Sequence, residues 1–457
     1  MNTKPRTMPS VPDAHGEADR LRAWLAADPY RSYLYAYPHK TAYRPFDEPI
    51  PLEQLWEGEP AETFFLYMHI PFCGARCGFC NLFTLPDKNA DAHERYVDAL
   101  ARQAKQLAPY VTRRPFARFA VGGGTPTLLE PKELERLFAI ATDELDVDLS
   151  LVSISVETSP ETVTPERLAI LRDHHTDRVS MGIQSFVEAE AAAIYRPQKP
   201  DEVERALTML RSFAFPILNL DLIYGLPGQT VDSWLYSLER ALVYEPEEIF
   251  LYPLYTRDHM IVKPSQIQES GTDVRMACYL AARERLLAAG YRQYSMRRFA
   301  KISAVSAKTL LPYDCQEEGM VGLGCGARSY TRDVHYASRY AVGRKATESI
   351  IADYVQAERY DKTDYGIILS LEEQRRRFIL KALLHAEGLQ LSSYAARFGS
   401  AAMDDYAELD LLVEAGLAGS EAGRLTLSAE GLALSDAIGD WFISPHIRER
   451  MEGFEMR

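Results

Sequence analysis

Between residue 63 and about residue 254, short runs rich in apolar, β-branched and aromatic residues alternate with longer stretches of helical periodicity. The strand-like runs are TFFLYMHI, RFAVGG, SLVSISVET, RVSMGIQ, ILNLDLIYG and EIFLYPLY. Helical stretches such as ERYVDALARQAKQLA and EVERALTMLRSF lie between them. This alternation predicts a parallel sheet with helical crossovers, and the near-continuous apolar runs are typical of strands buried on both faces. The fold class is therefore α/β, as an open sheet or a partial (β/α)6 barrel.

The residues at the ends of these runs favour the barrel. A cysteine-rich loop follows the first run, Gly122-Gly123-Gly124-Thr125-Pro126 follows the second, and the next three end at Glu157, at Gln184 and at Asp221 with Gly225. In β/α barrels the active site is built at the carboxyl ends of several strands. The sequence thus predicts a site at that end of a TIM-like partial barrel.

The segments outside the repeated pattern suggest four parts. Residues 1–62 are rich in Pro, Tyr and Ala, without a clear sheet pattern, and form an expected N-terminal extension with a short helix near Ala18–Ala27. Residues 63–300 are the expected barrel, and residues 301–364 a segment that closes the site. Residues 365–457 are expected to form a helical, winged-helix-like domain that contains a hairpin. This domain has mixed charge and no basic recognition helix, so a structural or substrate-covering role is favoured over nucleic-acid binding.

The charge, hydropathy and cysteine content of the chain limit the classes of molecule that it is expected to bind. The chain of 457 residues has a formal net charge of −14, which disfavours non-specific binding to nucleic acid. It has no apolar run of 18 residues and no apolar signal-peptide core near its first residue, so we expect a cytoplasmic protein without a membrane span. Cytoplasmic thiols stay reduced, so clustered cysteines indicate a metal site rather than a disulfide.

The cysteine cluster lies in YMHIPFCGARCGFCNLFT, where Cys73, Cys77 and Cys80 have the spacing C-x3-C-x2-C. Structural zinc normally takes four protein ligands, and the other cysteines, at 278, 315 and 325, are scattered. Thiolates are the usual ligands of iron–sulfur clusters. A [4Fe–4S] cluster held by three cysteines would leave one iron open to another ligand, which favours the cluster over zinc.

The stretch from Tyr67 through HIPFC to Cys80 resembles the radical SAM superfamily, and more narrowly the oxygen-independent coproporphyrinogen III oxidase (HemN) family. The resemblance implies that Cys73, Cys77 and Cys80 hold a [4Fe–4S] cluster whose open iron binds S-adenosylmethionine (SAM). One electron, from a donor such as flavodoxin or ferredoxin, then cleaves SAM. The resulting 5′-deoxyadenosyl radical abstracts hydrogen from a small-molecule substrate.

Further motifs of the same family occur in order along the chain. The resemblance implies that the cleaved SAM is framed by Tyr67, Phe79, Gly123, Gly124, Thr125 and Glu157. On the residues alone, the triple glycine is also typical of a tight turn, Glu157 of a solvated or salt-bridged carboxylate, and Phe79 of a core anchor for the loop. Tyr67 is also a candidate catalytic residue.

Three polar residues extend the predicted site. Gln184, Arg196 and Asp221 match family positions that surround a second SAM beside the first, so one or two SAM molecules are expected. Asp221 lies within a strand-like run between Leu220 and Leu222, where a carboxylate is costly unless it is paired or binds a ligand.

The later segments GYRQYSMRRFAK and CQEEGMVGLGCGARSY resemble those that close the family's active site. Arg297 and Arg298 could steer an acidic substrate or be solvated surface residues. Cys315 and Cys325 are most simply small buried hydrophobes. Cys325 is the second candidate catalytic residue, which would meet the substrate radical. The segment from LSLEEQ to LSDAI resembles the HemN C-terminal domain.

The reaction itself is left open among three alternatives. Cys80 is followed by Asn81, where porphyrinogen-decarboxylating members carry a further cysteine. The haem-chaperone branch (HemW) carries an H-N-x-x-Y-W type stretch where this chain has LLPYDCQEEGM. The alternatives are an oxidoreductase of the coproporphyrinogen oxidase type, in porphyrin biosynthesis or on an unassigned substrate, a two-SAM radical C-methyltransferase, and a HemW-like haem carrier.

Overall fold

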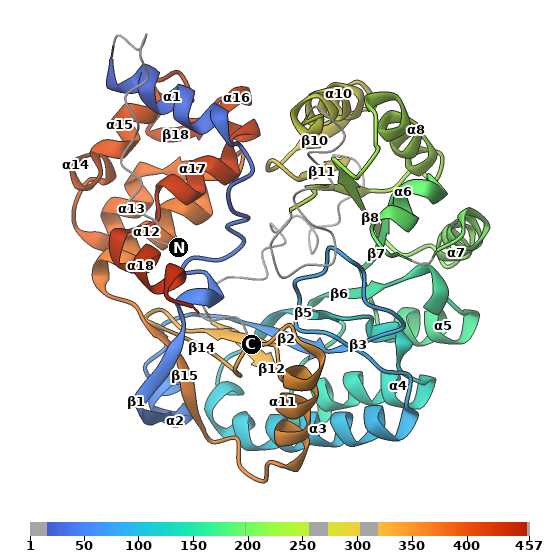
Figure 1. Ribbon diagram of the computed structural model, residues 1–457. Helices are drawn as coiled ribbons and strands as arrows, with labels where there is room; N and C mark the ends of the chain where they lie inside the picture. Colours follow the sequence, from blue (N-terminus) through green and yellow to red (C-terminus); the bar gives the residue numbers. More distant parts are fainter. Residues whose placement is uncertain (1–15, 197, 256–272, 302–318, 455–457) are drawn as a thin grey trace. The chain divides into compact units, whose positions relative to one another are not determined.

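The computed structural model describes residues 16–196, 198–255, 273–301 and 319–454 (Figure 1). The chain forms two compact units. Of the described residues, the larger comprises those within 43–292 and 300–368, and the smaller comprises 16–42, 293–299 and 369–454. Among the described residues, residues 16–42 group with residues 369–454 in the smaller unit.

The larger unit contains most of the strands. They are β1 (Arg44–Pro51), β2 (Phe64–Ile70), β3 (Phe72–Cys73), β4 (Leu85–Pro86), β5 (Phe116–Gly123), β6 (Ser153–Thr158), β7 (Arg178–Gln184), β8 (Ile217–Tyr224), β9 (Glu248–Pro253), β12 (Met320–Leu323), β13 (Arg328–Tyr330), β14 (Val334–Ala337) and β15 (Lys362–Ile368). Its helices are α2 (Leu52–Glu57), α3 (Ala90–Val111), α4 (Pro131–Ala139), α5 (Pro165–Asp173), α6 (Glu188–Ala193), α7 (Pro200–Ser212), α8 (Val231–Leu242), α10 (Arg275–Ala288) and α11 (Arg344–Gln356). The short strands β10 (Tyr291–Gln293) and β11 (Arg298–Lys301) follow α10.

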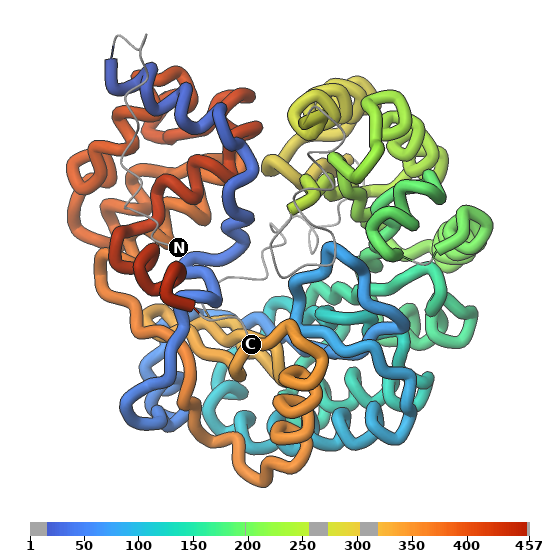
Figure 2. Tube along the Cα trace, in the orientation of Figure 1, coloured from blue at the N-terminus to red at the C-terminus, as the bar shows by residue number. Residues whose placement is uncertain are grey.

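The parallel strands confirm the predicted partial barrel. They lie in the order β2-β5-β6-β7-β8-β9, each hydrogen-bonded to the next in parallel. Helices α3, α4, α5, α7 and α8 lie around the outside of this curved sheet, and the trace passes from each strand to its neighbour in chain order (Figures 1 and 2). The carboxyl ends of the six strands therefore lie at one end of the unit.

The parallel strands are buried on both faces, as predicted, and the face toward the inside of the barrel carries polar residues. Glu157 on β6 pairs with Ser180 on β7, Ser180 with Asn219 on β8, and Asn219 with Glu248 on β9. These four residues form one row across the sheet. Since side chains alternate along a strand, the row and the positions two residues away line the inner side of the barrel, which we call the lumen.

The remaining strands of the larger unit continue the sheet beyond β2. Strand β12 pairs in parallel with β2, and β12, β13, β14, β15 and β1 then follow as antiparallel neighbours. The expectation of no strand in residues 1–62 is wrong for β1. This segment contains Pro45, Pro49 and Pro51, which cannot donate ladder hydrogen bonds, but an edge strand tolerates them.

The smaller unit combines an N-terminal helix with the C-terminal helices. Helix α1 (Glu17–Ala27) confirms the helix expected near residues 18–27, and Leu21 and Leu25 are its buried residues. The other helices are α12 (Leu371–Leu383), α13 (Leu391–Phe398), α14 (Ala402–Asp405), α15 (Ala407–Glu414), α16 (Ala429–Ala433), α17 (Ser435–Trp441) and α18 (Pro445–Glu452). The predicted hairpin is formed by β17 (Ala418–Glu421) and β18 (Arg424–Leu427), with β16 (Leu389–Gln390) beside it.

Arg297 belongs to this smaller unit and is not the solvated residue allowed for from the sequence. Its side chain is 9% exposed and donates to both carboxylate oxygens of Asp436, each at 2.6 Å. The Arg297 guanidinium also lies 3.9 Å from the centre of the Tyr33 ring. Arg298 lies near the ring of Tyr294, with its guanidinium carbon 5.0 Å from the ring centre.

The Arg297–Asp436 pair leads to a stability prediction. Asp436→Ala is expected to lower the free energy of unfolding of this unit by about 3 to 5 kcal/mol, because the Arg297 charge would stay buried without its partner. Glu430→Ala removes a partner of Arg22 from a half-exposed pair and should cost less than about 1 kcal/mol. Urea unfolding of both variants measures the difference, and equal losses would contradict the prediction.

Candidate functional site

The cysteine loop begins at the carboxyl end of β2. Strand β3 contains Cys73 and pairs in parallel with β4, so the chain between them forms a loop that returns to run beside β3 in the same direction. Backbone hydrogen bonds from Leu85 N to Pro71 O (2.7 Å) and from Asp87 N to Cys73 O (3.2 Å) fix the base of this loop. Helix α3 starts just beyond, where the Asn89 side chain accepts from Asp91 N at 3.0 Å. The loop is therefore anchored at both ends.

Each of the three thiols has its own side-chain partner. Cys73 Sγ lies 3.9 Å from Thr125 Oγ1, and Cys77 Sγ lies 3.5 Å from Arg196 Nη1. Cys80 Sγ lies 3.7 Å from Thr84 Oγ1. Thr125 belongs to the glycine-rich segment of residues 122–126 at the end of β5, which we call the glycine loop. Arg196 lies in the turn after α6, and Thr84 belongs to the cysteine loop itself.

The chemistry of the three thiols fits an iron–sulfur cluster. Burial, together with the nearby thiols of Cys80 and Cys77, raises the pKa of Cys73 to about 12. Burial also raises the pKa of Cys77, while Arg196 opposes the rise. Thiolates in such a place need a cationic group to offset their charge. A cluster with a separate iron for each cysteine supplies this charge.

The donor set of the cysteine loop consists of three thiols, from Cys73, Cys77 and Cys80. A tetrahedral structural zinc site normally takes four protein ligands. Three thiols suit a four-iron cluster, because each cysteine then binds a different iron. The donor set thus fits the cluster better than it fits zinc.

The glycine loop packs directly against the start of the cysteine loop. Gly124 N donates to Ile70 O and Thr125 N donates to Phe72 O, both at 2.7 Å. A Cβ atom on Gly124 would lie 2.4 Å from Phe72 O. The close packing against Phe72 O therefore requires glycine at position 124. The same packing places the glycine loop beside Cys73, as we expected for the site.

His69 is a residue of the site that the sequence analysis did not single out. Its Nε2 lies 2.8 Å from Phe83 O, and a carbonyl only accepts, so Nε2 carries the hydrogen. Its Nδ1 can then accept from the Tyr67 hydroxyl at 3.3 Å. A Cβ atom at Gly123, whose φ is +111°, would lie 2.5 Å from the His69 ring. The only signal in the sequence was the position of His69 within HIPFC.

Glu157 lies at the end of β6, faces the lumen and is hydrogen-bonded to the glycine loop. Its Oε2 accepts from Gly123 N at 3.0 Å. The side chain is exposed to the lumen, yet the surrounding barrel raises its pKa to about 7. Lost solvation is the largest cause and Asp221 adds to it, while the Gly123 N–H and Arg178 oppose the rise. The carboxyl group can therefore change its charge near neutral pH.

Asp221 also faces the lumen, but it lies within β8 rather than at its end. Asn219 Nδ2 donates to Asp221 Oδ1 at 2.7 Å and to Ser180 Oγ at 2.6 Å. Burial raises the pKa of Asp221, whereas Arg178 lowers it. Arg178 is itself held by Glu248 at 2.8 Å. Polar and charged neighbours within the protein thus offset the free-energy cost of burying the Asp221 carboxylate.

Gln184 and Arg196 come from the end of β7 and from the turn after α6. The β7–β8 register shifts between Gly182 and Gln184, and Gln184 has a φ of +70°. Such a bulge re-aims a side chain at the end of a strand. Arg196 donates from Nη2 to Gly182 O and from Nε to Gln198 Oε1 at 2.7 Å. The structure therefore brings Arg196 to the cysteine loop.

Phe79 packs onto the barrel wall, beside a buried cluster near the carboxyl ends of β8 and β9. The buried members of this cluster are Ile194, Ile223, Leu226 and Leu254, and Tyr252 packs against it too. Gly78 N also donates to Ile194 O at 2.8 Å. These contacts anchor the loop, which is the second of the two roles considered for Phe79 from the sequence.

Cys325 lies in the turn after β12 and is fully buried, with its Sγ 3.7 Å from the Tyr96 hydroxyl of α3. Burial raises its pKa to about 12. The thiol therefore stays neutral and adjoins α3. Its predicted contact with a substrate radical remains a prediction. Cys315 lies outside the described residues.

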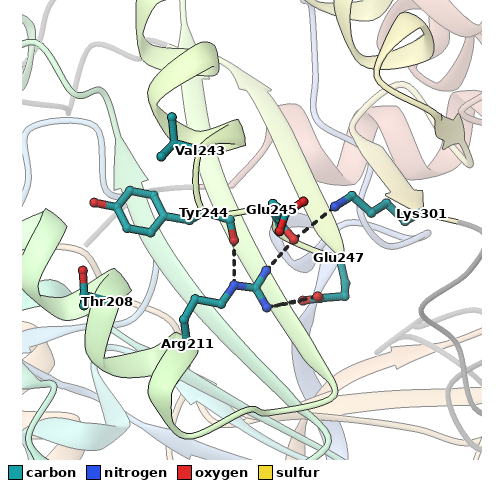
Figure 3. Close-up of a pocket in the computed structure, with 7 residues that line it drawn as sticks. All are labelled: Thr208, Arg211, Val243, Tyr244, Glu245, Glu247 and Lys301. Carbon is teal, nitrogen blue, oxygen red and sulfur yellow. Dashed lines mark hydrogen bonds and ion pairs between the residues drawn. The ribbon is translucent and has the colours of Figure 1, made fainter.

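A separate hollow of about 550 Å³ lies near the amino ends of β8 and β9, away from the predicted site (Figure 3). It is lined by Thr208, Arg211, Val243, Tyr244, Glu245, Glu247 and Lys301. Arg211 already binds Glu247 at 3.0 Å and Tyr244 O at 2.6 Å, and Lys301 Nζ lies 3.2 Å from Glu245 O. The two cationic side chains of this hollow, Arg211 and Lys301, are thus already hydrogen-bonded to oxygen atoms of the protein.

No helix in the described ranges combines the length and the apolar character needed to cross a membrane.

Comparison with known proteins connects this geometry to a family. Residues 67–241 match the radical SAM superfamily model, and residues 369–434 match the HemN C-terminal domain model. The chain is 24% identical over 382 residues to the heme chaperone HemW of Lactococcus lactis, covering 82% of this chain and 96% of that protein. It is 25% identical over 390 residues to the oxygen-independent coproporphyrinogen III oxidase of Salmonella typhimurium, covering 82% and 83%.

The fold matches a solved structure over nearly its whole length. Coproporphyrinogen III oxidase (HemN) from Escherichia coli aligns with a TM-score of 0.72 at 23% identity, covering 91% of this chain and 99% of that chain. The radical SAM family implies a [4Fe–4S] cluster and SAM, and the spacing of Cys73, Cys77 and Cys80 matches that requirement. The chain belongs to the radical SAM superfamily, within the HemN/HemW family.

Proposed function

We propose that this protein is a radical SAM oxidoreductase that removes a hydrogen atom from a small-molecule substrate bound in the lumen. The observation that carries the proposal is the anchored loop of three thiols at the carboxyl end of β2, beside the glycine loop and Glu157. Cys73, Cys77 and Cys80 would hold the cluster. When bound, the cluster and SAM supply a 5′-deoxyadenosyl radical, given one electron from a donor such as flavodoxin or ferredoxin.

The residues around the loop have distinct proposed tasks. Tyr67, Gly123, Thr125 and Glu157 would bind and orient the SAM that is cleaved, with the Glu157 carboxylate suited to its positive charge. Gln184, Arg196 and Asp221 would bind the substrate or a second SAM, as the resemblance implies. The polar lumen suits a ligand with charged or hydrogen-bonding groups, and the barrel wall would exclude water from the reacting atoms.

A second candidate is a haem carrier, favoured by the similarity to a heme chaperone along 96% of that protein's length. Anaerobic reconstitution, reduction with SAM present and mass spectrometry of the products test the proposal. 5′-Deoxyadenosine formed in proportion to a consumed substrate supports the oxidoreductase. S-Adenosylhomocysteine beside it would instead indicate methyl transfer. Stoichiometric haem binding with only uncoupled 5′-deoxyadenosine would indicate the carrier.

The pKa of Glu157 leads to a pH prediction. A group with a pKa of about 7 is mostly protonated at about pH 6 and mostly ionised at about pH 8. The ionised form attracts the positive sulfonium of SAM, so the affinity for SAM should rise severalfold over this range. Glu157→Gln keeps an acceptor for Gly123 N but cannot ionise, and it should bind SAM weakly and without this rise. Equilibrium dialysis measures both, and the same rise in the variant would contradict the assignment.

A further inference from the structure

The residue that contacts Cys80 is the last residue of the cysteine-rich stretch YMHIPFCGARCGFCNLFT, and no role has been given to it above. Thr125 and Arg196, which contact the other two thiols, were already placed in the SAM-binding part of the site. Thr84 was not, although its Oγ1 lies 3.7 Å from Cys80 Sγ, within hydrogen-bond distance for sulfur. It is the polar end of the stretch CNLFT.

The fold holds Thr84 firmly beneath Cys80. Its two neighbours are fixed, because Phe83 O accepts from His69 Nε2 at 2.8 Å and Leu85 N donates to Pro71 O at 2.7 Å. Thr84 itself is 4% exposed. In the described part of the chain, the structure gives its hydroxyl no hydrogen-bond partner other than Cys80 Sγ.

The direction of this hydrogen bond follows from the chemistry of the ligand. A cysteine bound to iron is a thiolate and has no proton to give. The hydroxyl must therefore donate to the sulfur. A hydrogen bond to a cluster sulfur withdraws negative charge and stabilises the reduced cluster, which carries one electron more, over the oxidised one.

We propose that Thr84 raises the reduction potential of the cluster by donating a hydrogen bond to the Cys80 sulfur. The inference rests on the proposed function, since it requires the cluster to be held by the three cysteines. Thr84 would thus be a positioning and tuning residue that touches neither SAM nor substrate. The electron still comes from the external donor; Thr84 makes the cluster a better acceptor for it.

The test is a redox titration of the reconstituted protein, without SAM, followed by electron paramagnetic resonance. Thr84→Val keeps the shape of the side chain and removes the hydroxyl. It is expected to lower the equilibrium constant for reduction about tenfold, which is about 59 mV for a one-electron couple. Thr84→Ser keeps the hydroxyl and should stay within about threefold of the wild type, or about 30 mV. Thr112→Val, at an exposed site on the far end of α3, is the control.

Three results would overturn the inference. They are a wild-type potential in Thr84→Val, an equal shift in Thr84→Val and Thr84→Ser, or a folded Thr84→Val protein without cluster while Thr84→Ser retains it. Should Thr84→Val not fold, Thr84→Ala removes the same hydroxyl and takes its place. Failure of the proposed function would look different, because the wild-type protein itself would then show no cluster signal.

Discussion

Cys77→Ala is expected to lose the iron–sulfur cluster and, with it, all cleavage of SAM. Two thiolates would remain in a loop where burial already raises the pKa of Cys73, and they would leave a second iron of the cluster without a protein ligand. Iron content should fall from about four atoms per chain to less than about one, and 5′-deoxyadenosine should be undetectable. Iron and sulfide assays, followed by product analysis, measure both.

The matched control is Cys278→Ala. Cys278 is a fully buried cysteine on α10, outside the cysteine loop, so its replacement should leave cluster content unchanged. Comparison of the two variants separates loss of a ligand from loss of any buried thiol. Wild-type amounts of 5′-deoxyadenosine from Cys77→Ala would remove this residue from the site.

Asp221→Asn is expected to retain the cluster and lose turnover. Asn219 and Ser180 surround the carboxylate inside the lumen, so replacing it with an amide keeps the shape but removes the charge offered to the ligand. We expect turnover to fall about 100-fold, which corresponds to about 2.7 kcal/mol of transition-state stabilisation. Iron content should match the wild type. Substrate-dependent formation of 5′-deoxyadenosine is the measurement.

The control for this variant is Asp410→Asn, which makes the same change at an exposed position on α15. It should leave turnover unchanged. If Asp221→Asn turned over as fast as Asp410→Asn, Asp221 would have no part in the reaction. If Asp221→Asn also lost the cluster, the carboxylate would have a structural role instead.

The elements that follow from local patterns were predictable from the sequence. The six parallel strands and the positions of Glu157 and Gln184 at strand ends follow from apolar periodicity and from the placement of polar residues. The hairpin of the smaller unit and helix α1 were found in the same way. Each of these depends on residues close together in the chain.

Features that depend on partners far apart in the chain were not predictable. Arg297 looked like a surface residue until the fold brought Asp436, 139 positions away, to its guanidinium. Strand β1 was missed because its prolines disfavour a strand, and only its pairing with β15 reveals it. The role of Thr84 was hidden because the β3–β4 pairing that folds it beneath Cys80 involves just two residues of each strand.

The glycine loop shows how one pattern can have two explanations. Gly123 and Gly124 were expected to frame the cleaved SAM, yet they also lie tightly against the His69 ring and Phe72 O, respectively. The same packing brings Thr125 to Cys73 and Gly123 N to Glu157. The glycines therefore position other residues of the site, in addition to any contact that they would make with a ligand.

The most direct measurement is electron paramagnetic resonance of the reduced, reconstituted protein with and without SAM, together with its iron content. Three cysteines and an open iron predict about four irons per chain and a signal that changes when SAM is added. Isotopically labelled SAM should show coupling of its amino nitrogen and carboxylate oxygen to the cluster. One metal ion per chain, or a cluster signal that SAM leaves unchanged, would contradict an open iron that binds SAM.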